Sequence, residues 1–338
     1  MKAVVLVGGE GTRMRPLTET LPKPLLPLMG RPFLHHVLDH LVAHGVHEII
    51  LSSPYLGANF ASFIEERHGD PKITWITETE PLGTGGAVLN ALDQVGGDPF
   101  FVLNGDILTD LNLTEMLAAH HERGSVVSIS TFHVDDARAF GLVITDDGGR
   151  ILEFREKPED PIPGDVNAGT YLIDPVVVQD FPRGANTSIE REIFPVLIER
   201  GLAMTAFGSD CYWLDLGTPE NYLRAHFDIL EGRVGFESEV VAPFIDPTAE
   251  VDLRSQLGRW VVVGERAVVA EGAEIEDSVV LAGASVGRNA KVVGTVLGPS
   301  ASVGEDARVD GCVLGEGASV PAGAVMGGEK IRRAGASG

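Results

Sequence analysis

The sequence is poor in cysteine, in aromatic residues and in basic residues. Its 338 residues include 2 cysteines, 6% aromatics, and 26 Lys and Arg against 49 Asp and Glu. Two cysteines cannot form a disulfide framework, so we expect a cytoplasmic protein. The formal net charge of −23 argues against nucleic acid or an anionic membrane surface as a partner, because both require a basic face.

Long apolar runs are also missing. The run at residues 3–7 is short and ends in glycines, unlike a signal peptide, and no stretch is long enough to span a bilayer. We therefore expect no membrane partner. The chain is longer than one hydrophobic core normally serves, which predicts two domains.

Residues 6–24 contain neither of two common phosphate-binding fingerprints. The Gly-Lys-Ser/Thr end of a Walker loop is missing, and Met14 stands where a dinucleotide fingerprint needs its third glycine. The segment nevertheless follows an apolar run and combines glycines with cations, namely Gly8, Gly9, Gly11, Arg13, Arg15 and Lys23. Glycines let backbone N–H groups approach an anion, and cations neutralise it. This combination favours polyphosphate binding over a chance cluster on a solvated loop.

Up to about residue 231, short β-branched runs alternate with amphipathic stretches, which predicts an α/β fold with a mixed or parallel sheet. The expected strands are residues 3–7, 48–52, 73–76, 100–103, 126–133 and 169–173. The expected helices are residues 33–44, 58–67, 87–94, 114–122, 190–200 and 219–230. The phosphate-binding segment then lies at the carboxyl end of the first strand, where open α/β sheets bind ligands.

After residue 232, aliphatic residues recur every five or six positions. They are Ile245, Val251, Leu257, Val263, Val269, Ile275, Leu281, Val286, Val292, Leu297, Val303, Val309, Leu314, Val320 and Val325. Hexapeptide repeats of this kind predict a parallel β-helix rather than an Ala/Gly/Val-rich linker. We expect a catalytic domain at 1–231, a linker at 232–244, the β-helix at 245–326 and a frayed tail at 327–338.

The stretch from Gly8 to Pro24 resembles the opening motif of the sugar-1-phosphate nucleotidyltransferases, Gly-Gly-x-Gly-Thr-Arg-x-x-Pro-Leu-Thr followed by Pro-Lys-Pro. Residues 212–219 are similar to a second motif of this family, Trp-x-Asp-x-Gly-Thr-Pro. The resemblance implies a Rossmann-like mixed-sheet α/β domain followed by a left-handed parallel β-helix. It also implies an enzyme that transfers a nucleotidyl group from a nucleoside triphosphate to a sugar 1-phosphate, releases pyrophosphate and uses Mg2+.

The same resemblance assigns roles to individual residues. Arg13 would stabilise the departing pyrophosphate and Lys23 would bridge phosphates, while Asp106 and Asp215 would hold Mg2+. Nucleotide binding falls to Leu6, Gly8, Gly9, Gly11, Thr12, Glu80, Leu82, Gly83, Asn104 and Gly105. Sugar-phosphate binding falls to Gly141, Glu156, Lys157, Asn167 and Gly169. In isolation, the stretches around Asp106, Glu156 and Leu82 are ordinary turns or a helix-capping loop.

Similarity to the guanylyl branch of the family, including residues 83–86 and 190–195, implies GTP and mannose 1-phosphate as substrates and GDP-mannose as product. Glu80 would accept hydrogen bonds from guanine. A glucose-1-phosphate uridylyl- or thymidylyltransferase is the alternative, and a non-catalytic regulatory paralogue is a second one. The last histidine, His226, precedes the repeats, which argues against acyl transfer there and favours a homo-oligomer built through the β-helix.

Two further features are interpreted without a chemical role. Glu192 stands where many members of the family carry Asp, so no function is assigned to it. His36, His40 and His44 have helical spacing, and we interpret them as a solvated stripe or a subunit contact rather than as a metal site.

Overall fold

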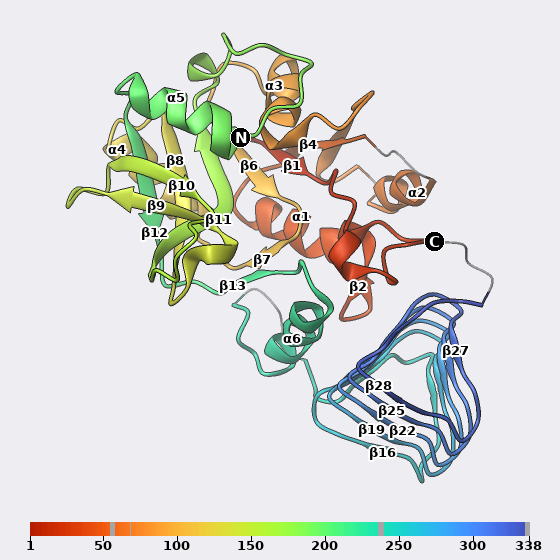
Figure 1. Cartoon of the computed structure of the whole chain (residues 1–338). Coiled ribbons are helices and arrows are strands. Elements are labelled where there is room, and N and C mark those ends of the chain that lie inside the picture. The colour runs from red at the N-terminus through yellow and green to blue at the C-terminus, as the bar shows by residue number, and fades with distance from the viewer. Residues whose placement is uncertain (55–57, 68, 236–239, 335–338) are drawn as a thin grey trace. The chain divides into compact units, whose positions relative to one another are not determined.

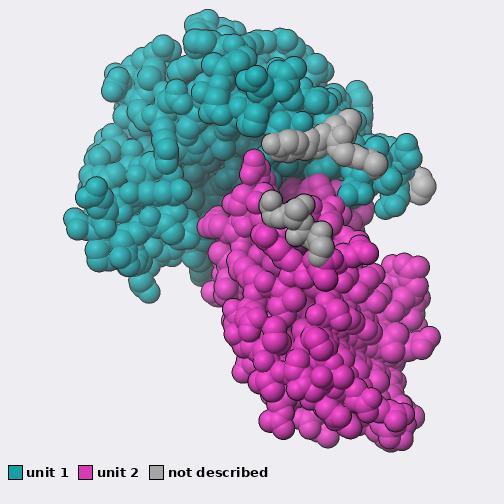
Figure 2. Space-filling model, turned by 45° about the vertical axis from the view of Figure 1, so that its right-hand side comes forward, with its two compact units in different colours: residues 1–9, 37–213 teal, residues 10–36, 214–338 magenta. Residues whose placement is uncertain are grey.

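The computed structural model describes residues 1–54, 58–67, 69–235 and 240–334. Residues 236–239 of the expected linker and 335–338 of the expected tail lie outside this description. The chain forms two compact units, residues 1–9 with 37–213 and residues 10–36 with 214–338 (Figure 2). The segment that carries Arg13 and Lys23 therefore belongs to the same unit as the repeats.

The first unit is built around a mixed sheet. Its strands are β1 (Lys2–Leu6), β4 (Glu48–Ser53), β5 (Lys72–Thr77), β6 (Phe100–Asn104), β8 (Val127–Val134), β9 (Gly141–Thr145), β10 (Ile151–Glu156), β11 (Gly164–Ile173) and β12 (Met204–Gly208). In the described residues they follow the order β10-β9-β11-β6-β1-β4-β5, with β8 beside β11 and β12 beside β8. β1 is parallel to β4 and β6, whereas β11 is antiparallel to β6, β8 and β9. The expected α/β fold with a mixed sheet is confirmed.

Helices pack against this sheet. They are α1 (Phe33–Ala43), α2 (Ala58–Glu66), α3 (Gly83–Val95), α4 (Leu113–Glu122) and α5 (Phe194–Glu199), the last preceded by a π-helical turn, η5 (Ile189–Ile193). α3 and the η5–α5 run share one hydrophobic core with β1, β6 and β11 (Figure 1). Within the described ranges, no helix is long and apolar enough to cross a membrane. The expected start of the third helix at residue 87 is wrong, because the glycines from Gly83 onward form its first turn.

The second unit begins with short elements of the N-terminal segment. These are the 3-10 turns η1 (Thr12–Met14) and η2 (Lys23–Leu25) and the strands β2 (Pro27–Leu28) and β3 (Arg31–Pro32). The short strand β7 (Ile107–Thr109) belongs to the first unit, whereas β13 (Trp213–Asp215) contains the boundary between the two units. α6 (Pro219–Leu230) follows β13 and belongs to the second unit. Thr218 Oγ1 accepts a hydrogen bond from the Asn221 backbone N–H at 3.3 Å, so Thr218 is the N-cap of α6.

The repeats form a left-handed parallel β-helix, as expected, and Figure 1 shows its coils stacked as a prism. One sheet holds β14 (Phe244–Ile245), β17 (Val261–Val263), β20 (Ser278–Val280), β23 (Val296–Leu297), β26 (Val313–Leu314) and β29 (Lys330–Ile331). A second holds β15 (Glu250–Val251), β18 (Val268–Val269), β21 (Ser285–Val286), β24 (Ser302–Val303) and β27 (Ser319–Val320). A third holds β16 (Gln256–Leu257), β19 (Glu274–Glu276), β22 (Lys291–Val293), β25 (Arg308–Asp310) and β28 (Val325–Gly327).

The repeat register departs from the predicted one at two positions. Ile245 pairs with Val263, 18 residues on, but Val263 pairs with Val280, only 17 residues on. Val280 therefore fills the core position that the sequence pattern gave to Leu281. Val325 is 75% exposed, and Met326 packs inward in its place. Lys330–Ile331, expected in a frayed tail, form β29.

Candidate active site

Two cations of the N-terminal segment face one carboxylate in the second unit. Lys23 Nζ lies 3.8 Å from Asp215 Oδ1, and Arg13 Nη2 lies 3.9 Å from Asp215 Oδ2. The Lys23 side chain is 9% exposed, whereas that of Arg13 is 68% exposed. Burial beside Asp215 holds the Lys23 side chain in place, whereas the exposed Arg13 guanidinium can contact an incoming anion.

Glycines make this approach of charges possible. Gly11 has φ +62°, and a Cβ atom there would lie 3.0 Å from Thr18 Cγ2 and 3.3 Å from Lys23 Cβ. Thr18 Oγ1 donates to the Gly11 carbonyl at 2.7 Å. A Cβ atom on Gly217 would lie 2.5 Å from Arg13 Nη2 and 2.9 Å from Asp215 Oδ1. Gly217 was not among the predicted site residues, although it lies inside the motif at 212–219.

In the first unit, the ends of β1 and β6 bring predicted nucleotide-binding residues together. Leu6 and Asn104 are partners in the parallel register, and the Gly105 N–H donates to the Leu6 carbonyl at 2.9 Å. Gly169 has φ +78°, and a Cβ atom there would lie 2.8 Å from Asn104 Nδ2. Asp106, half-buried, follows directly. Gly105 and Gly169 thus let the strand ends approach closely at this edge.

Gly8 and Gly9 follow β1 and differ in their surroundings. A Cβ atom on Gly8 would lie 2.9 Å from Pro54 Cδ, whereas one on Gly9 would meet no atom within 4 Å. Thr12 opens η1, and its carbonyl accepts from the Arg15 N–H at 3.2 Å. The close approach at Gly8 therefore requires a glycine, while Gly9 is unconstrained by protein atoms.

The loop before α3 is fixed by a residue that the sequence analysis did not select. Glu78 is 5% exposed; it accepts from Ser52 Oγ at 2.9 Å and from the Leu82 N–H at 3.0 Å. The Leu82 carbonyl in turn accepts from the Thr187 N–H at 2.8 Å, so both backbone groups of Leu82 hold the loop in place. Gly83 has φ +68°, and a Cβ atom there would lie 2.7 Å from the Thr187 carbonyl. Glu80 is exposed.

A hydrogen-bond network around Glu190 links this loop to the predicted sugar-phosphate residues. Thr84 Oγ1 and Ser188 Oγ each donate to Glu190 Oε2 at 2.7 Å. Tyr171 Oη donates to Glu190 Oε1 at 3.3 Å and accepts from Asn167 Nδ2 at 2.8 Å. Burial, together with the Glu190 carboxylate, raises the pKa of Tyr171 well above its usual value, which keeps the phenol a donor.

The same network extends to the turn of β11. Asn167 Oδ1 accepts from the Gly169 N–H at 3.0 Å. The sequence analysis assigned no role to Thr84, Tyr171, Ser188 or Glu190, although Thr84 and Glu190 lie within the stretches 83–86 and 190–195 that resemble the guanylyl branch. They are joined only in the folded chain, where Thr84 and Glu190 are 106 positions apart.

Gly141, Glu156 and Lys157 form a second predicted group in the first unit. Gly141 is the register partner of Glu156 between β9 and β10, and a Cβ atom on Gly141 would lie 3.0 Å from Glu156 Oε2. Lys157 has φ +48°, and its N–H donates to the Phe140 carbonyl at 2.9 Å. Lys157 Nζ and Arg191 Nη2 both lie 3.8 Å from Glu156 Oε1. A carboxylate with flanking cations suits a hydroxylated, phosphorylated ligand.

An aromatic wall lies beside these residues. The Trp213 ring stacks on Phe132 with a centroid distance of 5.3 Å and meets Phe140 edge-on at 5.4 Å. Trp213 Nε1 donates to the Ala168 carbonyl at 2.8 Å. The indole thereby fixes the backbone between Asn167 and Gly169.

Two sequence interpretations are revised. His36 and His40 are 1% and 5% exposed, so the expected solvated stripe is wrong. Burial and the neighbouring His44 lower the pKa of His40 to about 4, which keeps the ring neutral at neutral pH. Glu192, left without a role, accepts from the Ser188 N–H at 2.8 Å and so caps the η5 turn.

Metal ligands are limited in the described part of the chain. No group of three or more His, Cys, Asp or Glu side chains there is placed to hold an ion. A magnesium site needs only one or two carboxylates, because substrate phosphates and water complete its coordination. Asp106 and Asp215 each satisfy that requirement as half-buried carboxylates at a strand end.

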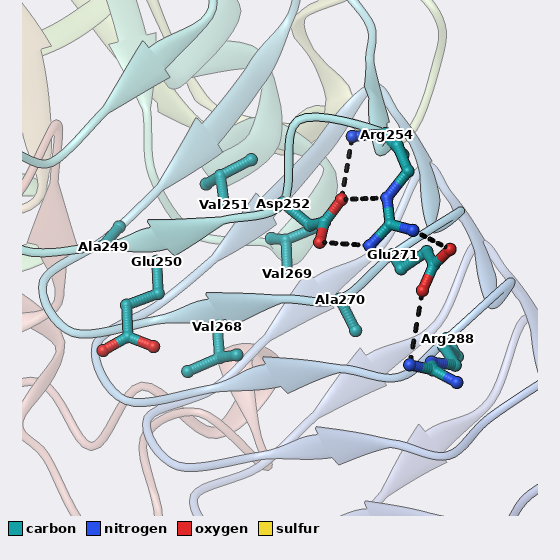
Figure 3. A pocket seen from close by; sticks show the side chains of 10 residues that line it. All are labelled: Ala249, Glu250, Val251, Asp252, Arg254, Val268, Val269, Ala270, Glu271 and Arg288. Carbon is teal, nitrogen blue, oxygen red and sulfur yellow. Dashed lines mark hydrogen bonds and ion pairs between the residues drawn. The ribbon is translucent and has the colours of Figure 1, made fainter.

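A hollow on the β-helix is a different kind of site. Figure 3 shows the Arg254 guanidinium between the carboxylates of Asp252 and Glu271, with Arg288 beside Glu271. Arg254 Nε lies 3.1 Å from Asp252 Oδ1, and Arg288 Nη2 lies 3.3 Å from Glu271 Oε2. These charges neutralise one another on an exposed face, so we assign no ligand to the hollow.

Comparison with known proteins agrees with this geometry. Residues 2–232 match the family described as Nucleotidyl transferase. The chain therefore belongs to the nucleotidyl transferase family, whose members generally use a divalent metal ion. Residues 240–333 match the family described as GMPPB C-terminal domain, and so both parts of the chain are matched.

Individual relatives extend over most of the chain. It is 37% identical to the mannose-1-phosphate guanylyltransferase of Mycobacterium tuberculosis, over 84% of this chain and 80% of that protein. It is also 37% identical to the probable mannose-1-phosphate guanylyltransferase 2 of Arabidopsis thaliana, over 85% and 83%. The crystal structure of HddC from Yersinia pseudotuberculosis complexed with GMP-PN is 31% identical, with a TM-score of 0.58, and covers 66% of this chain and 97% of HddC.

Proposed function

We propose that this nucleotidyltransferase converts mannose 1-phosphate and GTP to GDP-mannose and pyrophosphate. The observation that carries the proposal is that the side chains of Arg13 and Lys23 both lie within 4 Å of the Asp215 carboxylate. The choice of substrates is supported by relatives named mannose-1-phosphate guanylyltransferase and by the guanine nucleotide analogue named in the HddC structure.

In the proposed reaction, an oxygen of the sugar phosphate attacks the α-phosphorus of GTP in line. The bond between the α-phosphorus and its bridging oxygen to the β-phosphorus breaks, and pyrophosphate leaves with that electron pair. The second pKa of a phosphate monoester is about 6, so the nucleophile is ionised near neutral pH and needs no general base. Catalysis then rests on positioning and on charge neutralisation.

Arg13 and Lys23 supply the positive charge. The exposed Arg13 guanidinium would bind the β- and γ-phosphates and stabilise the charge that grows on them as the bond breaks. Lys23, buried and held opposite Asp215, would contact the phosphate between donor and acceptor. Gly8 and Gly11 let the backbone N–H groups come close to the triphosphate.

Asp106 and Asp215 are the proposed ligands of Mg2+. The donor set fits the ion, since both are half-buried carboxylates at a strand end. When bound, the ion would neutralise charge on the α-phosphate. The test of this assignment is ion binding itself, which is independent of turnover.

The sugar phosphate would bind in the group around Glu156. The Glu156 carboxylate would accept from sugar hydroxyls, Lys157 would meet the phosphate, and Asn167 would donate to the ring substituents. Glu80 would accept hydrogen bonds from the base, and the backbone of Leu82 and Gly83 would lie against its edge. Asn104 and Gly105 would bind the nucleotide at the end of β6, and Gly169 would bind the sugar phosphate beside Asn167.

We further propose that the protein is cytoplasmic and assembles as a homo-oligomer through its β-helix. The low cysteine content supports the first proposal. Sedimentation at micromolar concentration tests the second, and a monomer there would contradict it.

A substrate panel tests the proposed reaction. Five nucleoside triphosphates are each combined with mannose 1-phosphate or glucose 1-phosphate, and pyrophosphate release is followed with Mg2+ present. We expect the highest kcat/KM for GTP with mannose 1-phosphate. A preference for UTP or dTTP with glucose 1-phosphate would favour the alternative transferase, and inactivity with every pair would favour a regulatory paralogue.

A further inference from the structure

The β-helix directly contacts the segment that carries Arg13. Lys330, on the last strand β29, donates from Nζ to the backbone carbonyl of Arg13 at 3.0 Å. Arg332 Nε pairs with Glu19 Oε1 at 2.7 Å. Two cations from the end of the repeats therefore hold both ends of the stretch 13–19, which belongs to the same compact unit.

An apolar contact lies between these two polar ones. Met14 and Leu17 are 0% and 2% exposed, and they pack in one cluster with Val296 of β23 and Val313 of β26. Each of these valines belongs to the β-helix sheet that ends in β29. The apolar side chains of residues 14 and 17 therefore pack against one face of the β-helix.

A glycine of the β-helix allows this contact to close. A Cβ atom on Gly315 would lie 2.9 Å from Pro16 Cβ and 3.4 Å from the Pro16 carbonyl oxygen. Gly315 follows β26, and its φ angle is not in the left-handed region. A side chain at this position would therefore fail for lack of space rather than through backbone strain.

The Arg13 segment needs such support because its own structure is short. η1 spans three residues and has no side-chain cap at its first position, and single 3-10 turns have weak hydrogen-bond geometry. The Arg13 side chain is largely exposed, so the place of its guanidinium depends on where the backbone is held. A displacement of a charge by about 1 Å can cost about a hundredfold in rate.

We infer that the last coil of the β-helix positions Arg13 for catalysis, with Lys330 and Arg332 as positioning residues. The inference rests on the proposed function, because it takes Arg13 as the group that binds the departing phosphates. It gives the repeats a role within each chain, in addition to assembly.

The first test compares Lys330→Met with Lys330→Arg and with a matched control, Lys291→Met. Lys291 is an exposed lysine of the β-helix whose partner, Glu274 Oε2 at 3.0 Å, also lies in the repeats. Hydrogen exchange of the amides of residues 12–19 is measured without substrate. We expect exchange about fivefold faster in Lys330→Met and unchanged in Lys291→Met, from the loss of one surface hydrogen bond.

Steady-state kinetics on the same proteins separate positioning from general destabilisation. We expect kcat about fivefold lower in Lys330→Met with KM changed by less than about twofold, and recovery in Lys330→Arg, whose guanidinium can also donate to the carbonyl. Kinetics and exchange equal to those of Lys291→Met would overturn the inference.

A charge exchange tests the second contact. Glu19→Arg and Arg332→Glu should each speed hydrogen exchange in residues 12–19, because each variant places two like charges together. The double variant should restore slow exchange, because it re-forms the ion pair with the two charges swapped. A double variant as fast in exchange as the single ones would count against the role of Arg332. Gly315→Ala should act like Lys330→Met, whereas Gly327→Ala, where a Cβ atom meets nothing within 4 Å, should be neutral.

These readouts distinguish failure of the inference from failure of the proposed function. If the wild-type chain transferred no nucleotidyl group, the proposed function would fall while the exchange data still decided whether β29 holds the segment. If wild-type activity were high and Lys330→Met kept both kcat and exchange, only the inference would fall.

Discussion

Thr84 at the start of α3 donates a hydrogen bond of 2.7 Å to Glu190 in the η5 turn. The same hydroxyl accepts from the Ile189 N–H at 3.0 Å, so its proton is committed to Glu190. Tyr171 donates to the other oxygen of this carboxylate. Glu190 therefore ties the proposed base loop and the proposed sugar site to one group.

Glu190→Gln should uncouple these two regions. The carboxylate accepts three hydroxyl protons, whereas an amide keeps one acceptor oxygen and turns an NH2 group toward a donor. We expect a loss of about 1–3 kcal/mol in the free energy of unfolding and a kcat/KM lower by about tenfold for both substrates. Urea unfolding and initial rates measure the two effects.

The matched control for Glu190 is Glu199→Gln, at the exposed end of α5. It should change neither quantity. Tyr171→Phe removes only the donor to Oε1 and the acceptor for Asn167, and it should weaken sugar phosphate more than nucleotide. If Glu190→Gln raised KM for one substrate alone, the coupling would be wrong.

Lys23→Met should remove a charge while keeping most of the side-chain volume. Because Lys23 is buried beside Asp215, we expect kcat to fall about 10²- to 10³-fold with little change in KM, as for an interaction strongest in the transition state. Stopped-flow single turnovers measure the chemical step. An effect confined to KM would contradict this role.

Asp106→Asn and Asp215→Asn should each weaken ion binding. Replacing a carboxylate by an amide removes one of the few protein ligands that magnesium uses. We expect Mn2+ affinity, followed by water proton relaxation, to fall about tenfold or more in each variant. The exposed Asp93→Asn serves as control. Wild-type Mn2+ affinity in both site variants would refute the metal assignment.

Gly141→Ala should damage the proposed sugar site sterically. The new methyl would lie 2.5 Å from Phe154 Cζ and 3.0 Å from Glu156 Oε2, so Glu156 must move. We expect KM for the sugar phosphate to rise about tenfold with KM for the nucleotide unchanged. Gly208→Ala, with its nearest contact at 3.5 Å, is the control. Equal KM values in the two variants would place the sugar elsewhere.

The sequence pattern was sufficient for the architecture but not for the details of register. Val280 and Leu281 are adjacent, aliphatic and buried, so a step of five or six residues was equally compatible with the pattern. Only the pairing of Val263 with Val280 decides between them. Spacing identifies a β-helix because every coil repeats it, whereas a single slip is a matter of packing.

The site was predictable where one motif holds its parts close in sequence. Arg13 and Lys23 belong to one motif, but the glycines of α3 resembled a loop because glycine is a poor helix former. They lie within α3, and glycine is required there because a Cβ atom on Gly86 would lie 2.5 Å from the Ala185 carbonyl. Such contacts between distant segments, like that of Thr84 with Glu190, leave no local signal.

Buried His226 should make stability fall in acid. The ring is 0% exposed, and burial, with a further contribution from His36, lowers its pKa from 6.5 to about 3. Between these two pKa values the unfolded chain binds a proton that the folded chain does not. The free energy of unfolding therefore decreases as the pH falls through this window, and above the window the protonation of His226 costs no stability.

His226→Gln should flatten this dependence. Removing one such group lowers the slope of the unfolding free energy against pH by up to about 1.4 kcal/mol per pH unit between about pH 4 and 6. Urea unfolding across that range measures the slope, which is independent of any constant cost of the substitution. The exposed His121→Gln should keep the wild-type slope. A wild-type slope in His226→Gln as well would mean that the ring is protonated in the folded protein, and that Met29, whose N–H donates to Nδ1 at 3.4 Å, does not fix it as a neutral acceptor.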